Sequence, residues 1–437
     1  MKKIKFIDLF AGLGGTRIGF EQACDDFGIK SECVFTSEIK PYAADIYKHN
    51  FSNEEVSGDI TKIDEKDIPD FDFLLGGFPC QAFSTAGKQA GFDDARGTLF
   101  FDVARIIKEK KPDGFLLENV EGLVSHDKKD KDDEIGNTLQ VIVKILKDLG
   151  YHVSWKVLNA VDFGVPQIRK RIYITGSLKS DISLNDFIKT SQVFNDIREK
   201  GLPTQDTEFT KKLLELYTPD ELAGKSIKDK RGGSQNIHSW DMELKGSINK
   251  DQKELMNTIM RERRKKKWAP LKGITWMDGM PLTLDEVFSF YDKKTKPQLK
   301  KMLDDLVKKK YIRFEHPKDL VERDGKKVRE YALDKEKGYN IVSGKLSFEL
   351  NKILGGDCIS ATIVATEADR IGVLDNGKIR RMSERECLRF FGFPEWYKSN
   401  IPHKKLYDLV GNTVVVPVIK EVSKKVLESL GYLKKLD

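Results

Sequence analysis

The first 177 residues alternate short apolar runs with segments of helical periodicity, and this pattern constrains the fold more than any other feature. Six apolar runs are typical of buried strands: residues 4–9, 33–36, 71–75, 114–117, 153–157 and 171–175. Between them, apolar residues recur three and four positions apart, as on a helix that buries one face. The alternation predicts an α/β domain built on a doubly wound, mostly parallel sheet.

Length and composition limit the class of protein. The 437 residues exceed what one compact core usually organises, so we expect two or three domains. No apolar run approaches the roughly 18 residues needed to span a bilayer. Lys5 and Asp8 interrupt the apolar start, which argues against a signal peptide. Five cysteines without a CxxC pair predict free thiols in the cytoplasm, with no membrane contact and no metal site.

The pattern changes after residue 177, which predicts a second, smaller domain over residues 178–381. Within it, residues 280–335 read as helix, helix and two-stranded ribbon, an arrangement that resembles a winged helix. Such a module binds nucleic acid or serves only for packing and protein contacts. The basic run at 261–267 is either a phosphate-contacting segment or a solvated helix face. Residues 382–437 return to the first pattern and are expected to complete the first domain.

A glycine-rich turn, FIDLFAGLGG at residues 6–15, lies between the first strand and the first helix. Glycines there let a ligand approach the backbone at a helix N-terminus. The dinucleotide fingerprint is not met, because Arg17 stands where a glycine is needed, so a ligand with an adenosine but no phosphates suits the turn better. Glu38 could bind ribose hydroxyls and Asp59 an adenine amino group, although a surface acid is the default interpretation of each.

Several chemically active side chains follow predicted strands. Cys80, in GGFPCQAFSTAG at residues 76–87, is either a nucleophile or a small apolar residue at a strand end. Glu118 ends an apolar strand, where a buried carboxyl is costly without a partner or a function. Arg169 and Arg171 precede the last strand of the domain. Because open α/β sheets build their sites at strand ends, these groups could face one pocket.

Nine stretches, taken together, resemble bacterial cytosine-5 DNA methyltransferases of restriction–modification systems. They are FIDLFAGLGG, SEIKPYA, GDIT, GGFPCQAFSTAG, RGTLFFD, LLENV, PQIRKRIYITG, RECLRFFGFP and LVGNTVVVPV. They occur in the family's order and cover most of residues 4–177 and about 380–420. The region between them is where that family varies. The resemblance favours Cys80 as the nucleophile.

The resemblance implies a Rossmann-like fold that uses S-adenosyl-L-methionine, yields S-adenosyl-L-homocysteine and needs no metal. It implies that Cys80 adds to C6 of a cytosine flipped out of the duplex, which activates C5 for methylation. Glu118 is expected at cytosine N3, Arg171 at O2, and Arg169 beside it in the pocket. Residues 178–381 become the expected target-recognition domain.

The resemblance also carries over binding residues. Those expected around the cofactor are Phe10, Ala11, Gly12, Leu13, Gly14, Glu38, Ile39, Asp59, Ile60, Pro79, Leu99, Asn412 and Thr413. Those expected to contact DNA are Gln81, Ser84, Arg261, Arg263, Arg264, Lys265 and Thr362. The expected partners are double-stranded DNA and a cognate restriction endonuclease encoded nearby, with the chain itself a monomer.

Two alternatives differ in substrate or in activity. An RNA cytosine-5 methyltransferase would share these motifs, but the long intervening region and the GFPCQ loop favour duplex DNA. A DNA-binding regulator that kept only the cofactor fold would be expected to lack the cysteine, the glutamate or the arginine, and all three are present.

Overall fold

The chain forms two compact units. The structure is a computed structural model that describes residues 3–52, 54–79, 99–128, 130, 132–229, 235–276, 279–323, 326–342 and 348–432. The first unit comprises Met1–Leu202, Gly356–Asp369 and Met382–Asp437, and the second comprises Pro203–Gly355 and Arg370–Arg381. These limits differ from the predicted ones, because residues 178–202 and 356–369 group with the first unit. None of the described helices is both long and apolar enough to cross a bilayer.

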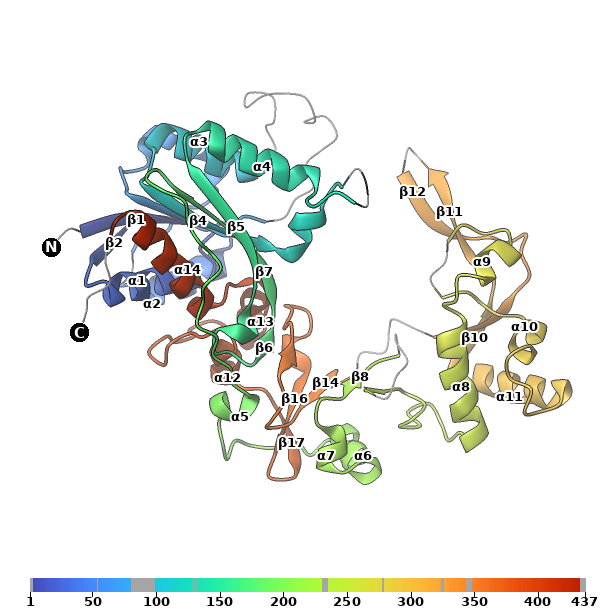
Figure 1. The fold of residues 1–437 in the computed structure, drawn as a ribbon. Coiled ribbons are helices and arrows are strands. Elements are labelled where there is room, and N and C mark those ends of the chain that lie inside the picture. Colours follow the sequence, from blue (N-terminus) through green and yellow to red (C-terminus); the bar gives the residue numbers. More distant parts are fainter. Residues whose placement is uncertain are drawn as a thin grey trace. The chain divides into compact units, whose positions relative to one another are not determined.

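A six-stranded sheet forms the centre of the first unit (Figure 1). Its strands are β1 (Lys3–Leu9), β2 (Lys30–Ser37), β3 (Phe73–Gly76), β4 (Gly114–Val120), β5 (His152–Asn159) and β7 (Lys170–Ser177). Their order across the sheet is β2-β1-β3-β4-β7-β5. Neighbours from β2 to β4 are parallel, whereas β7 runs antiparallel to both β4 and β5. The predicted mostly parallel, doubly wound sheet is confirmed.

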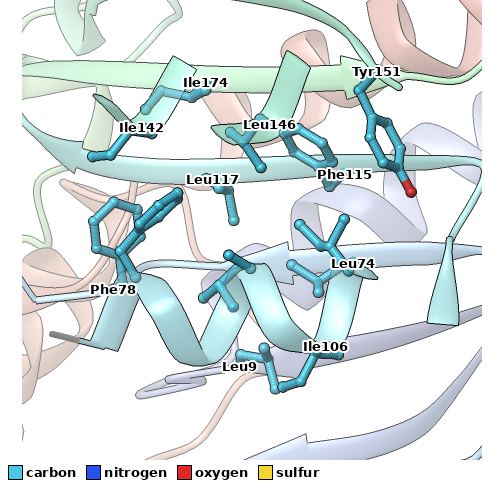
Figure 2. Packing of buried hydrophobic residues seen from close by; sticks show 14 of the residues in the cluster. Leu9, Leu74, Phe78, Ile106, Phe115, Leu117, Ile142, Leu146, Tyr151 and Ile174 are labelled. Atoms are coloured by element: carbon cyan, nitrogen blue, oxygen red, sulfur yellow. The ribbon is translucent and has the colours of Figure 1, made fainter. Parts of the chain in front are cut away.

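Helices cover both faces of this sheet. The unit's helices are α1 (Gly15–Asp26), α2 (Pro41–Asn50), α3 (Leu99–Lys110), α4 (Asn137–Asp148), α5 (Phe194–Ile197), α12 (Glu384–Arg389), α13 (His403–Asn412) and α14 (Val416–Ser429). Figure 2 shows one face, where Leu9, Leu74 and Leu117 pack with Ile106 of α3 and Leu146 of α4. Burying each such side chain contributes about 2 kcal/mol.

The opposite face uses the alternate residues of the same strands. Phe6 of β1 and Phe73 of β3 both pack against Phe20 of α1, with ring centroids 5.0 and 4.5 Å apart. Because side chains alternate along β4, Glu118 lies on the opposite face from Leu117. A short parallel pair, β6 (Gln167–Ile168) with β15 (Ser360–Ala361), attaches the 356–369 segment to this unit.

The second unit contains two apolar cores. Around one of them lie α6 (Glu208–Leu216), α7 (Pro219–Leu222), β8 (Ser226–Ile227), β9 (Asn236–Ile237), β14 (Lys352–Leu354), β16 (Ile371–Asp375) and β17 (Lys378–Arg381). Around the other lie α8 (Lys250–Glu262), α9 (Trp268–Leu271), α10 (Leu284–Phe288), α11 (Lys296–Lys308), β10 (Ile312–Glu315) and β13 (Gly338–Ile341). The strands β11 (Lys318–Arg323) and β12 (Lys326–Tyr331) pair with each other and contribute none of the described residues of this core.

The second of these cores belongs to a module that includes the segment predicted to resemble a winged helix. Helices α10 and α11 and the hairpin β11–β12 occur where the sequence places two helices and a ribbon. The core also contains Trp240 at one end and Ile341 at the other, so the module extends over about 240–341 rather than 280–335. The additional helix α8 begins at the N-cap Asn249, whose side chain accepts from the Gln252 amide N–H.

Candidate active site

A cavity of about 580 Å³ lies in the first unit, at the edge of the sheet where the parallel strands end. Its walls come from the turns after β1, β2, β3 and β4, from the start of β7, and from α13 and the residues after it. The strand order reverses between β1 and β3, and such a switch point is where open α/β sheets place their ligands.

The glycine-rich turn after β1 forms one wall. Gly14 caps α1 with φ of 74°, and a Cβ there would lie 2.4 Å from the Phe51 ring, so the turn requires glycine. Phe10 also has a positive φ, 59°, which is uncommon for a bulky residue and typical of functional turns. The Ala11 N–H donates to the Ser37 carbonyl at 3.1 Å, and this bond ties the turn to β2.

Glu38 joins two of the loops that line the cavity. Its carboxylate accepts from the Gly12 N–H at 2.9 Å and from the Lys40 N–H at 2.8 Å. A carboxylate has about four acceptor sites, so these two bonds fix its orientation and leave capacity for a ligand. The next residue, Ile39, is 67% exposed and lines the cavity, as does Phe10, which gives the wall apolar faces beside the acid.

Asp59 supplies a second acid to the same wall. Its Oδ1 accepts from the Thr61 hydroxyl at 2.8 Å and from the Thr61 N–H at 3.1 Å. These bonds hold the pKa of Asp59 below its usual value, so this group is ionised near neutral pH. The cavity therefore combines two acids with apolar surface, which suits a nucleoside with free hydroxyl and amino groups.

Glu118 and Arg171 meet on the other side of the cavity. The register of β4 with β7 places Tyr173 opposite Glu118 and Arg171 opposite Val120. Arg171 Nε lies 3.1 Å from Glu118 Oε1, and the glutamate side chain is only 11% exposed. Burial raises the pKa of Glu118, and the positive charges of Arg171 and Arg169 oppose that rise without cancelling it. Glu118 therefore holds a proton to higher pH than an exposed glutamate.

Arg169 is 2% exposed and binds backbone carbonyls. Its guanidinium donates to the carbonyls of Gly411 at 3.3 Å, Thr413 at 2.7 Å and Ile363 at 3.3 Å. Burial, aided by the nearby charge of Arg171, lowers the pKa of Arg169 to about 10, so it stays charged at neutral pH. Arg169 thus holds the chain after α13 against the cavity.

The loop after β3 carries the predicted nucleophile. Asn119 Nδ2 donates to the Phe78 carbonyl at 2.9 Å, which fixes the chain leading to Pro79, and Pro79 lines the cavity. Cys80 is the next residue in the sequence; it lies outside the described residues, as do Gln81 and Ser84.

The other four cysteines are described, and none of them lines the cavity. Burial raises the pKa of Cys24 to about 12 and that of Cys33 to about 11, and it raises the pKa of Cys387 as well. These three thiols therefore resist forming a nucleophilic thiolate.

The family model of the C-5 cytosine-specific DNA methylases matches residues 4–428. The chain belongs to this family. It is 56% identical to Type II methyltransferase M.NlaIV of Neisseria lactamica over 430 residues, covering 98% of this chain and 100% of that one. It is 32% identical to M.HhaI of Haemophilus parahaemolyticus over 429 residues, covering 98% and 96%. These matches confirm the resemblance drawn from the motifs.

A solved structure, that of the S. pombe Dnmt2 methyltransferase, shares the fold of this DNA methylase. The TM-score is 0.54, with 16% sequence identity, and the match covers 98% of this chain and 100% of the other. At this identity the likeness concerns the fold alone.

Most of the residues predicted at the methylase site line one cavity. Of the described residues expected to bind the cofactor or take part in catalysis, all do so except Leu13 and Gly14. Leu13 is fully buried, and Gly14 packs against Phe51. The lining residues that the motifs did not single out are Thr16, Ser37, Lys40, Gly58, Gly77, Phe78, Asn119, Val120, Leu409, Gly411 and Val414. Most of them are adjacent in the sequence to a predicted residue, and this adjacency is the signal from which they could have been predicted.

The residues predicted to contact DNA divide between surface and interior. Arg261, Arg264 and Lys265 are exposed. Arg263 is only 5% exposed, because it ends α8 on the side that packs into the core, and its Nη1 donates to Asn340 Oδ1 at 2.6 Å. Arg263 therefore does not lie on a solvated helix face, which was one of the two interpretations of the basic run. The Thr362 hydroxyl donates to the Ile168 carbonyl at 2.8 Å, within the first unit.

The hydrogen bonds of Arg169 to the carbonyls of Ile363, Gly411 and Thr413 lead to a stability prediction. Arg169→Gln removes the charged donors and leaves buried carbonyls without partners, so we expect the free energy of unfolding to fall by about 3 kcal/mol. Lys170→Gln, at the adjacent residue, whose side chain is half-exposed, should change it by less than about 1 kcal/mol. Urea denaturation of both variants tests this, and equal stabilities would contradict a stabilising role for the hydrogen bonds of Arg169.

Proposed function

We propose that this methylase transfers a methyl group to C5 of a cytosine in duplex DNA, with Cys80 as the nucleophile. The observation that carries the proposal is that Pro79, which directly precedes Cys80, lines the same cavity as Glu118 and Arg171. The family, and the Type II methyltransferases that match the whole length of the chain, support a sequence-specific enzyme of a restriction–modification system.

The acid-lined half of the cavity would hold S-adenosyl-L-methionine, which, when bound, would supply an electrophilic methyl sulfonium. Glu38, already oriented by two backbone donors, would accept from the ribose hydroxyls, and Asp59 from the adenine amino group. Phe10 and Ile39 would cover the apolar faces of the base. The methionine part would be bound by Leu99, Asn412 and Thr413.

Cys80 changes the reactivity of the cytosine ring. Its thiolate adds to C6 and forms a C6–Sγ bond, so the electrons of the C5–C6 double bond become available at C5. After C5 has gained the methyl group, a base removes the C5 proton. The electrons of that C–H bond restore the double bond, and the C6–Sγ bond breaks to regenerate the thiolate.

Glu118 stabilises the ring while Cys80 is attached. Addition at C6 increases electron density at N3, where a protonated carboxyl can donate a hydrogen bond. The raised pKa of Glu118 keeps this proton available. Arg171, 3.1 Å from the carboxyl, would donate to O2 of the base. Thymine already carries a proton on N3, so this pair also favours cytosine.

The reaction requires the target base to leave the duplex, because a stacked base cannot present C5 and C6 inside a cavity. We propose that the second unit reads base edges in the major groove and so selects the target sequence. We further propose that the chain acts in the cytoplasm as a monomer, beside a cognate restriction endonuclease encoded nearby.

The assignment of the nucleophile is tested by removing the sulfur of Cys80. Cys80→Ala should abolish methyl transfer to plasmid DNA, measured with labelled cofactor and by bisulfite sequencing, while cofactor affinity stays within about twofold. Cys358→Ala, at a cysteine outside the cavity, should retain full activity. Turnover by Cys80→Ala would refute the assignment. Transfer to transcribed RNA but not to plasmid DNA would make the enzyme an RNA methyltransferase.

The protonation of Glu118 predicts a pH dependence. Its pKa is raised, so the neutral form dominates at low pH and is lost as the pH rises through that value; methylation should fall on this alkaline limb. Glu118→Gln cannot lose such a proton, so its alkaline limb should disappear while kcat drops by roughly 10²–10⁴-fold. An unchanged pH profile for the variant would exclude Glu118 as the titrating group.

A further inference from the structure

A second cavity, of about 190 Å³, lies in the 240–341 module of the second unit. Its walls include residues of the strands β10, β11, β12 and β13 and the end of α8. The hairpin β11–β12 projects from the module, away from α8 and α11 (Figure 1). None of the nine methyltransferase motifs contributes a described residue to this cavity, but Arg263 of the basic run at 261–267 lines it.

Basic side chains dominate the wall of this cavity. The basic residues are Arg263, Arg313, His316, Lys318 and Arg329, and the carboxylate beside them is Glu315. Glu315 accepts from the Tyr331 hydroxyl at 3.0 Å and from Asn340 Nδ2 at 2.9 Å, which are neutral donors. Among the ion pairs of the described residues, none includes Arg313, Lys318 or Arg329. Arg313, Lys318 and Arg329 therefore line the cavity beside a single described carboxylate, that of Glu315.

Two of these cations, Lys318 and Arg329, lie over aromatic rings, which carry no charge. The Arg329 guanidinium lies 4.7 Å from the centre of the Trp276 ring, and Lys318 Nζ lies 4.5 Å from that of Tyr331. Trp276 is held in place because its N–H and that of Thr275 both donate to Asp319 Oδ1 at 3.0 Å. Such cation–π contacts orient a side chain and leave its N–H groups free to bind an anion.

One of the lining residues, Arg263, is buried. Arg263 donates to Asn340 Oδ1 at 2.6 Å, which fixes its guanidinium. Gly279, with φ of 77°, lies so close that a Cβ there would be 3.2 Å from Arg263 Nη1. Arg263, predicted to contact DNA from a solvated face, instead lines this cavity as a buried residue.

We propose that this cavity binds a phosphate group of the DNA backbone. The inference rests on the proposed function, because DNA is the polyanion that the enzyme must hold. Guanidinium groups match the oxygens of a phosphate, and the cavity gathers three arginines and a lysine around one small space. Contacts of this kind position a protein on a duplex and carry no sequence information themselves.

The test replaces the three cations that have no ion pair, as Arg313→Gln, Lys318→Gln and Arg329→Gln in one protein. Binding to duplexes with and without the target sequence is measured by fluorescence anisotropy at several salt concentrations. Loss of one phosphate contact should lower the slope of log Kd against log salt by about 0.9, which weakens binding about eightfold at 0.1 M salt. The factor should be the same for both duplexes.

A matched variant keeps the same change in net charge. It combines three substitutions in one protein: Lys253→Gln, Lys293→Gln and Lys300→Gln. These lysines lie in the same module but outside the cavity, and each has an ion pair. This variant should retain the wild-type salt slope. Arg329→Lys, which keeps the charge, should retain it as well. An equal slope for the cavity variant and the matched variant would overturn the proposal.

Two further arms separate the possible failures. In the first arm, the thermal midpoint of unfolding is measured with and without inorganic phosphate. If phosphate raises the midpoint of the wild type but not of the cavity variant, and both proteins bind DNA equally, the cavity is an anion site unrelated to DNA. The proposal then fails. If the wild type methylates plasmid DNA and the cavity variant keeps its affinity and slope, only this inference falls. If the wild type methylates no DNA, the proposed function falls.

Discussion

The antiparallel register between β4 and β7 is the constraint on which the site depends. It places Arg171 beside the end of β4, where its Nε reaches Glu118. A shift of one residue would move the arginine to the other face of the sheet. A buried carboxylate without a partner costs several kcal/mol, and Arg171 offsets part of that cost. The effect of burial still outweighs that of Arg171, so the pKa of Glu118 is raised and favours the protonated carboxyl that the proposed chemistry needs.

The residues just before β7 bring distant parts of the chain to the same edge. Gln167 donates to the Phe390 carbonyl at 3.1 Å and accepts from the Ile363 N–H at 3.0 Å. Arg169 binds the carbonyls of Gly411 and Thr413. Segments about 200 residues away in sequence therefore complete a cavity whose other walls come from the first 120 residues. The C-terminal helices belong to the first unit, where α14 also packs against α1.

Much of this arrangement could be predicted from the sequence, because its signals are local. Apolar runs located the strands, and the carboxyl ends of parallel strands meet at one edge, which places Glu38 and Glu118 around one cavity. The direction of β7 was not predictable, since an apolar run does not encode strand polarity. The carbonyl partners of Arg169 were not predictable either, because no local pattern reports a contact across about 240 residues.

The second unit shows the same limit. The spacing in α11 and the hairpin turn were readable, and two helices and a ribbon follow from them. Helix α8 had a usable signal, with Leu255, Met256 and Ile259 on one face, but its basic end suggested a solvated run. Whether Arg263 faces solvent or core depends on packing against Asn340, which is 77 residues away. Charge in a sequence locates a basic segment, whereas burial decides which of its residues can meet a ligand.

The central claim is that a thiolate at position 80 bonds to cytosine C6 during methylation. Duplex DNA carrying 5-fluorocytosine at the target position tests it most directly, because fluorine cannot leave as a proton does and the bond should persist. Mass spectrometry of the digested complex should find the methylated nucleotide on the peptide that contains Cys80. Normal methylation of cytosine with no adduct on the fluorinated duplex, or an adduct on another residue, would contradict the account.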